Sequence, residues 1–170
     1  MPAVYVKDYA AELRRVGDVV FKGRYRSPFL IVTGRAAELV DEPAGRDKTV
    51  LSAPSPDGAK ETAIINRVFP VTKAQHAPRG PIVLGRSGEN DVAIPEYSIS
   101  RRQCFFEFEP EGITVTDCGS TNGTLLGGSR LEPGEPTLIR DGMSITFGRF
   151  AFVFRTAVGF HGFIKSLNQQ

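Results

Sequence analysis

Short apolar segments separated by turn-forming residues recur from residue 62 onward, and this pattern constrains the fold more than any other feature of the chain. The breakers between the segments are rich in glycine, proline, aspartate and asparagine, and no helical periodicity lies between them. Many short strands with frequent turns predict an all-β sandwich or barrel. The expected strands span residues 62–69, 82–84, 92–94, 103–109, 113–117, 124–126, 137–139, 144–147 and 150–155.

The two ends of the chain differ from this pattern, because apolar side chains there recur at helical spacing. Residues 7–16 predict a short helix that ends at Gly17, and residues 160–167 predict a second amphipathic helix. The strand at 150–155 is apolar on both faces, which indicates that both of its faces are covered. We expect the two helices to pack together over the second face of that strand.

The change in pattern divides the chain into three expected parts. Residues 1–61 form an N-terminal extension that packs on the sandwich, residues 62–156 form the β domain, and residues 157–170 form a C-terminal amphipathic helix and tail. Within the extension, the apolar segment 29–33 predicts a strand. The Pro-, Gly- and Ser-rich residues that follow predict a loop with one short strand at 49–51.

Composition and charge exclude several classes of protein. The formal net charge of +2 lacks the marked basic excess of a general nucleic-acid binder. The apolar run Phe29–Val32 is far too short to span a membrane, so no membrane partner is expected. The N-terminus lacks a basic region followed by a long apolar stretch, and with only two cysteines the chain is expected to be cytoplasmic.

The sequence contains no set of residues that predicts catalysis or metal binding. Two cysteines and two distant histidines do not make a zinc site, and no nucleophile elbow, metalloprotease motif or phosphate-binding Walker motif is present. We therefore expect neither an enzyme, nor a cofactor, nor a metal. The basic residues near the N-terminus fit a solvated face better than a contact for an acidic partner: Arg14, Arg15, Lys22, Arg24, Arg26 and Arg35.

Three loops at the ends of expected strands carry the polar residues that stand out. Gly85-Arg86-Ser87 directly follows the strand at 82–84, and a fixed guanidinium of Arg86 there could bind an anion. Ser100 precedes an Arg-Arg pair, and residues 117–124 read Asp-Cys-Gly-Ser-Thr-Asn-Gly-Thr. Taken singly, each loop also fits an ordinary reading: a surface arginine, a turn with an exposed basic pair, and an Asn-Gly hairpin turn.

Taken together and in this order, the three loops resemble the forkhead-associated (FHA) domain. The resemblance continues through Leu126–Leu131 and through Leu138–Gly148, which reads Leu-Ile-Arg-Asp-Gly-Met-Ser-Ile-Thr-Phe-Gly. It covers about residues 62–156, and the whole chain is similar to small stand-alone bacterial FHA proteins. The resemblance implies a β-sandwich of about eleven strands, with short helices at the two ends of this chain.

The FHA resemblance implies a phosphothreonine-peptide binding module rather than an enzyme. Arg86, Ser100, Arg101 and Thr121 match the positions that hold the phosphate, and Asn122 matches the asparagine that holds the peptide main chain. Two glycines match backbone positions that shape these loops: Gly85 and Gly123. The implied partner is a phosphothreonine-containing protein, namely a Ser/Thr kinase or its substrate.

The sequence departs from the family pattern at Gln103, where the family has a histidine that buttresses the loop. Glutamine also donates and accepts hydrogen bonds, but from a longer side chain, so a less rigid loop is expected. Cys104 and Cys118 flank an expected hairpin, and we expect two buried, reduced thiols rather than a redox-sensitive pair.

The residues also support two alternative functions. A phosphate-independent interaction or scaffold module would keep the fold and use another face, such as the helical ends, and Gln103 favours it. A nucleic-acid-binding protein would use the basic residues 1–37, although the near-neutral total charge argues against it.

Overall fold

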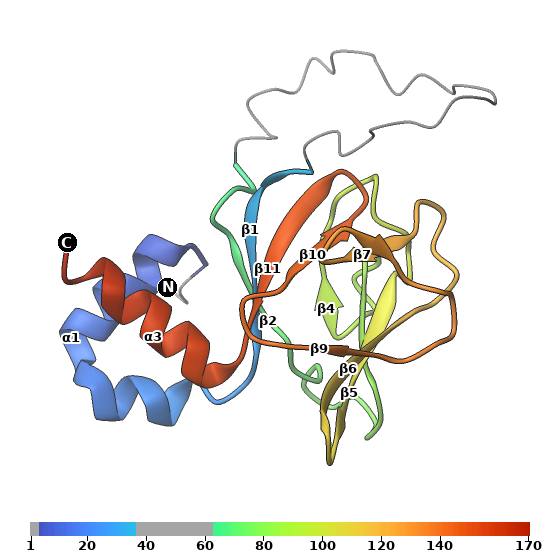
Figure 1. Ribbon diagram of the computed structural model, residues 1–170. Coiled ribbons are helices and arrows are strands. Elements are labelled where there is room, and N and C mark those ends of the chain that lie inside the picture. Colours follow the sequence, from blue (N-terminus) through green and yellow to red (C-terminus); the bar gives the residue numbers. More distant parts are fainter. Residues whose placement is uncertain (1–3, 37–62) are drawn as a thin grey trace.

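Two β-sheets face each other in the computed structural model, which describes residues 4–36 and 63–170 (Figure 1). The first sheet has six strands in the order β2-β1-β11-β10-β7-β8: β1 (Phe29–Arg35), β2 (Val68–Pro70), β7 (Thr124–Leu126), β8 (Ser129–Arg130), β10 (Ser144–Phe147) and β11 (Phe150–Arg155). The second has five in the order β4-β3-β5-β6-β9: β3 (Ile82–Gly85), β4 (Val92–Ala93), β5 (Cys104–Glu109), β6 (Gly112–Asp117) and β9 (Thr137–Ile139). These strands confirm the predicted all-β sandwich.

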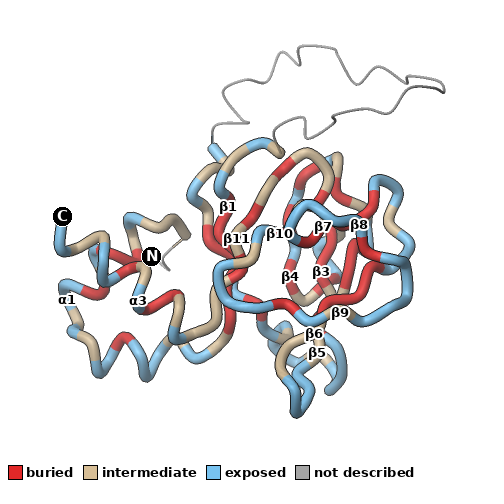
Figure 2. Tube along the Cα trace, in the orientation of Figure 1, coloured by how far each residue is buried: buried red, intermediate tan, exposed pale blue. Residues whose placement is uncertain are grey.

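The core lies between the two sheets, as the buried segments in Figure 2 show. Along β11, Phe150, Phe152 and Phe154 are fully buried and alternate with half-buried residues. Successive side chains of a strand point to opposite faces, so this alternation places all three rings in the core. On the facing sheet, Phe106 stacks on Phe154 with ring centroids 6.2 Å apart.

The two helices, α1 (Val6–Arg24) and α3 (Ala157–Leu167), lie side by side next to β1 and β2 (Figure 1). They bury a second apolar cluster on the outer face of these strands, where Phe160 of α3 stacks on Phe29 with centroids 4.0 Å apart. Ile31 and Val68 belong to the same cluster. The buried residues under the helices thus come from β1 and β2, and the cluster contains none from β11, whose Arg155 lies over the ring of Phe163 of α3.

The first helical segment of α1 ends at Gly17 as predicted, and a second helical segment, which was not predicted, continues to Arg24. Gly17 has φ +77° and ψ +166°, which is non-helical backbone and produces a kink between the two segments. Phe21 in the second segment is fully buried and packs against Phe160, and this contact stabilises the helix beyond Gly17. Helical spacing alone does not reveal such a tertiary anchor.

The predicted strand at 62–69 is mostly a turn, since residues 63–66 form a turn and β2 begins only at Val68. Asn66 has φ +64°, a conformation that asparagine tolerates better than most residues and that a strand does not contain. Ile64 packs on the sandwich core from this turn, so its apolar character reflects packing, not strand pairing. The strand predicted at 49–51 lies outside the described residues.

Strand β1 belongs to the six-stranded sheet itself. It pairs along its length with β11, from Phe29 opposite Arg155 to Arg35 opposite Phe150, and on its other edge with β2. The predicted division of the chain at residue 62 therefore separates strands of one sheet. Within the described residues, no helix is long and apolar enough to cross a membrane.

The two cysteines are free and occupy different surroundings. Cys104 lies opposite Asp117 in the β5–β6 register and is fully buried in the core, where burial raises the pKa of its thiol. Cys118 is exposed, and its N–H donates to the carbonyl of Gln103. Because Cys118 is not buried, the expectation of two buried thiols holds only for Cys104.

Candidate functional site

Five side chains that the sequence singled out line one open hollow of about 450 Å³ at an end of the sandwich: Arg86, Ser100, Arg101, Thr121 and Asn122. Three connections bring them together. The first follows β3, the second joins β4 to β5, and the third joins β6 to β7. Loops held by a rigid sheet scaffold are a frequent place for binding residues.

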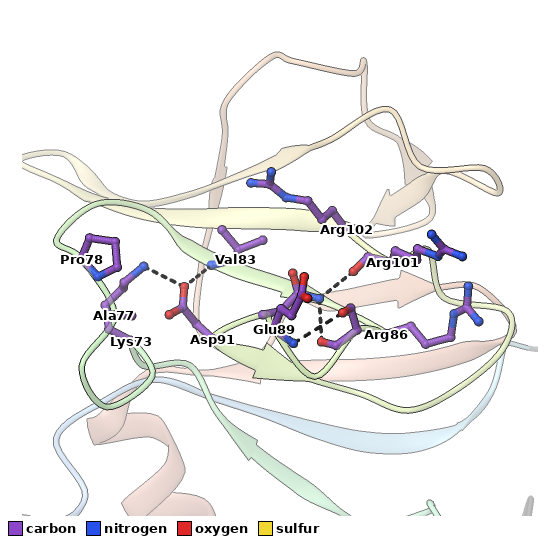
Figure 3. Close-up of a pocket in the computed structure, with 11 residues that line it drawn as sticks. Lys73, Ala77, Pro78, Val83, Arg86, Glu89, Asp91, Arg101 and Arg102 are labelled. Carbon is purple, nitrogen blue, oxygen red and sulfur yellow. Dashed lines mark hydrogen bonds and ion pairs between the residues drawn. The ribbon is translucent and has the colours of Figure 1, made fainter.

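Arg86 is fixed at both its backbone and its side chain. Its N–H donates to the carbonyl of Ser100 at 2.9 Å, and its Nε donates to the carbonyl of Ile99 at 3.2 Å. The Nε hydrogen bond fixes the orientation of the guanidinium, and the terminal nitrogens can donate to other acceptors. Figure 3 shows the guanidinium groups of Arg86 and Arg101 pointing to the same side.

Gly85, just before Arg86, allows the β3 end to approach the β4–β5 connection closely. A Cβ atom at this position would lie 2.2 Å from the carbonyl oxygen of Arg101, which is inside any permitted contact. Asn90 also holds the β3 end against the Arg101 backbone. Its Nδ2 donates to the carbonyl of Arg101 at 2.6 Å and to that of Ser87 at 2.8 Å. The backbone that carries Arg101 is therefore held from two sides.

Ser100 links two of the three connections. Its Oγ accepts a hydrogen bond of 3.0 Å from the N–H of Thr121, so its hydroxyl proton is left to donate to a ligand. Asn122 makes a second link, since its Nδ2 donates to the carbonyl of Ser98 at 3.1 Å. Thr121 and Asn122 are themselves exposed, and their polar atoms border the hollow.

Gln103 lies beneath the hollow and is fully buried. Its Oε1 accepts from the N–H of Ser100 at 3.0 Å, and its Nε2 donates to the carbonyl of Gly123 and to the Oγ1 of Thr124, both at 3.0 Å. The expectation of a less rigid loop at Gln103 is therefore wrong, because both ends of the amide are engaged. The argument that this residue favours a phosphate-independent module loses its basis.

Asp117 organises the β6–β7 connection, and sequence reasoning did not count it among the site residues. It accepts from the N–H groups of Gly119 and Ser120, from the hydroxyl of Ser120 and from that of Thr124. Burial raises the pKa of the Asp117 carboxyl, but these hydrogen bonds, led by those from Ser120 and Thr124, lower it by more. Asp117 opens the segment Asp-Cys-Gly-Ser, and an aspartate at the start of a glycine-containing turn is the sequence signal for this role.

The electrostatic character of the hollow is positive. Three arginines line it, Arg86, Arg101 and Arg102, and no acidic residue is among its lining residues. The same three arginines border an adjacent pocket of about 720 Å³ (Figure 3). At the far end of that pocket, Asp91 pairs with Lys73 at 2.8 Å, so its charge is already compensated.

The hollow offers hydrogen-bond donors and positive charge but no catalytic set. Guanidinium groups, a serine hydroxyl and an asparagine amide are the groups that bind oxyanions in proteins. Among the residues that the structure describes, no group of three His, Cys, Asp or Glu side chains could hold a metal ion. The fold and the site define a class: a β-sandwich whose loops form an anion-binding hollow at one end.

Comparison with known proteins agrees with this class. Residues 82–148 match the family model of the FHA domain. All the predicted site residues lie inside the matched range.

The relatives of this chain include mycobacterial proteins. The chain is 31% identical over 111 residues to the ABC transporter ATP-binding/permease protein Rv1747 of Mycobacterium tuberculosis, a match that covers 61% of this chain and 12% of that protein. It is 32% identical over 72 residues to the glycogen accumulation regulator GarA of M. tuberculosis, which covers 42% of this chain and 43% of GarA. The matches thus span less than half of the length of either relative.

A solved structure is also similar to part of the chain. The FHA-2 domain of the M. tuberculosis ABC transporter Rv1747 shares 32% sequence identity, with a TM-score of 0.40. The match covers 49% of this chain and 75% of that domain.

Proposed function

We propose that this chain is a phosphothreonine-peptide binding module, in which Arg86, Ser100, Arg101 and Thr121 hold the phosphate and Asn122 holds the peptide main chain. The observation that carries the proposal is the convergence of these five side chains on one hollow that no acidic residue lines. Gly85, Gln103 and Gly123 shape the loops from behind.

The charge of the ligand fits the charge of the hollow. A phosphothreonine carries about −1.5 to −2 charges and three strong acceptor oxygens at neutral pH. Arg86 and Arg101 compensate that charge, and the free hydroxyl proton of Ser100 reaches an additional phosphate oxygen. Hydrogen bonds to charged groups contribute roughly 1.5–3 kcal/mol each, so a few of them with main-chain contacts give roughly micromolar affinity.

Pre-organisation of the loops supports the same proposal. Gln103 and the hydroxyl of Ser100 tie the three connections to one another without a ligand. Binding then orders little additional backbone, and the free energy of the phosphate contacts is available for affinity.

The proposal extends to the setting of the protein. The partner is a phosphothreonine-containing protein of Ser/Thr kinase signalling, either the kinase or one of its substrates, and the chain acts in the cytoplasm as a binding module and not as an enzyme. The curated relative GarA is a regulator by its name, which supports a regulatory role for a chain with this domain.

A degenerate peptide library tests the proposal. The chain is immobilised and exposed to peptides with a fixed phosphothreonine and random flanking residues, and in parallel to the same library with unmodified threonine. We expect retention of phosphothreonine peptides only. Failure to retain any member of the phosphothreonine library, by a protein whose circular dichroism shows the folded sandwich, would sink the proposal.

A further inference from the structure

A groove at the helical end of the molecule takes no part in the proposed phosphate site. It has a volume of about 680 Å³ and lies between the first half of α1, the second half of α3 and the turn at residues 63–66. Figure 1 shows the two helices side by side. Half-buried apolar side chains line the groove: Val6, Ile65, Phe163 and Leu167.

The walls of this groove are tied to one another by hydrogen bonds. At the end of α3, the Nδ2 of Asn168 donates to the carbonyl of Ala10 at 3.0 Å, and its Oδ1 accepts from the Nη1 of Arg14 at 2.8 Å. At the start of α1, the hydroxyl of Tyr5 donates to the carbonyl of Ala63 at 2.9 Å. The groove therefore has a fixed shape, and a ligand orders little of it on binding.

The rim of the groove is basic. Lys7 and Arg14 are exposed and border the groove, and no acidic residue is among the described residues that line it. The carboxylate of the neighbouring Asp8 is engaged at the start of α1, where it accepts from the N–H groups of Val4 and Tyr5. An apolar floor with a cationic rim is complementary to a ligand that combines apolar side chains with carboxylates.

The spacing of the rim residues indicates the shape of that ligand. Lys7, Ala10 and Arg14 follow one another at three and four residues, so they share one face of α1. The two cations are separated by about 10 Å along the helix axis, because an α-helix rises about 1.5 Å per residue. Phe163 and Leu167, four residues apart, share a face of α3 in the same way. A third helix placed between these two faces matches this repeat.

We propose that this groove docks an acidic amphipathic helix of a partner protein. Apolar side chains of the partner lie on Phe163 and Leu167, and carboxylates two helical turns apart pair with Lys7 and Arg14. The sequence assigns Arg14 to a solvated face, but in the structure its position beside an apolar floor gives it this additional role.

The groove and the phosphate hollow lie at opposite ends of β11. Ser98, which lines the hollow, accepts at its Oγ from the N–H of Arg149, directly before β11. Helix α3 begins at Ala157, just after the other end of that strand. A strand of this length spans about 20 Å, so the chain holds a phosphorylated partner and an acidic helix at the same time.

Selection from a phage-displayed library of random peptides tests the proposal. The peptides have about 15 residues, which is enough for several helical turns. The full chain is the target, and the Lys7→Glu variant is used to remove peptides that bind elsewhere. Phage-displayed peptides carry no phosphate, so the hollow is not expected to retain them. We expect the enriched sequences to combine at least two Asp or Glu residues with large apolar residues three or four positions apart.

One enriched peptide is then synthesised, and its dissociation constant is measured by fluorescence anisotropy. Lys7→Glu and Arg14→Glu each place a like charge opposite a carboxylate, so both are expected to bind at least about tenfold more weakly than wild type. Lys7→Glu decides the test, because Arg14→Glu also removes the hydrogen bond to Asn168. An acidic residue in the first turn of a helix is favourable, so Lys7→Glu is expected to fold.

Arg15→Glu supplies a matched control, because the Arg15 side chain is 70% exposed and is not among the described lining residues. It is expected to bind the enriched peptide like wild type, and Lys7→Glu is expected to bind a phosphothreonine peptide like wild type. Enrichment of no peptide, enrichment of peptides without acidic residues, or equal binding of the peptide by wild type and Lys7→Glu overturns the proposal. An equal loss with Arg15→Glu also overturns it. A wild-type protein that binds the acidic peptide but no phosphothreonine peptide overturns the proposed function alone.

Discussion

The Nε2 atom of Gln103 donates a hydrogen bond of 3.0 Å to the carbonyl oxygen of Gly123, twenty residues further along the chain. Together with the bond from Ser100 N–H to the Oε1 of Gln103, it joins the β4–β5 and β6–β7 connections through one buried amide. The proposed phosphate-binding residues on these two connections are therefore held in a common geometry.

Substitution Gln103→Leu tests this coupling, because leucine has a similar size but no polar atoms. The N–H of Ser100 and the carbonyl of Gly123 would lose their partner inside the protein, at a cost of about 1–3 kcal/mol in the free energy of unfolding. Urea denaturation measures that loss. We also expect weaker phosphopeptide binding, and an affinity equal to that of wild type would contradict the positioning role of Gln103.

Gly85 offers a test of backbone proximity with a built-in control. Gly85→Ala places a Cβ 2.2 Å from the carbonyl oxygen of Arg101, so the β3 end and the Arg101 backbone must move apart. We expect a lower melting temperature and a loss of phosphopeptide binding. Gly88→Ala, three residues on, meets nothing within 4 Å and is expected to behave like wild type in both measurements. Equal effects of the two substitutions would refute the argument.

The hydrogen-bonded carboxylate of Asp117 is expected to make the free energy of unfolding depend on pH. Hydrogen bonds hold its pKa below the usual value in the folded protein, so its contribution is present above the unfolded pKa of about 4 and is lost as the pH falls through the folded pKa. Asp117→Asn should therefore be less stable than wild type at neutral pH by about 1–3 kcal/mol. The difference should shrink below about pH 4. Urea unfolding as a function of pH measures it, and a constant difference would count against the ionised carboxylate.

The helical end of the molecule is predicted to stabilise the fold without taking part in the site. Phe160 is fully buried and stacks on Phe29, so Phe160→Ala should lower the free energy of unfolding by about 3–5 kcal/mol. Val158, which is 84% exposed on the same helix, is the control, and Val158→Ala should change little. Removal of residues 158–170 should also lower the melting temperature. An unchanged melting temperature would mean that the α1–α3 cluster does not support the sandwich.

Much of the sandwich could be predicted from local sequence signals. The turn residues Gly127-Gly128 and Asp141-Gly142 lie where the chain reverses, and the glycines at 127, 128 and 142 have positive φ. The Phe150–Phe154 alternation correctly placed three rings in the core. These features depend on neighbours in the chain, and a single sequence contains that information.

The features that the sequence did not predict depend on tertiary contacts. The continuation of α1 beyond Gly17 relies on burial of Phe21 against Phe160, more than a hundred residues away. In the site, the residue types that bind phosphate were visible, but the stabilising partners of Gln103 and the four hydrogen bonds to Asp117 were not. Which donors meet a buried acceptor is decided by how loops fold over one another.

The central claim, that the hollow binds a phosphothreonine, is tested most directly by isothermal titration calorimetry. A peptide selected from the phosphothreonine library is titrated into wild-type protein, into Arg86→Ala and into Arg140→Ala, and the unmodified threonine form of the peptide is titrated in parallel. Arg140 follows β9, whose Ile139 pairs with Ile113 far from the Asp117 end of β6, so it serves as a charge-matched control.

The account predicts roughly micromolar binding of the phosphothreonine peptide to wild type and to Arg140→Ala. It predicts at least about 100-fold weaker binding to Arg86→Ala, and the same for the threonine form, because the charged hydrogen bonds to the phosphate are lost. Equal affinity of wild type for the phosphorylated and unphosphorylated peptides would contradict it.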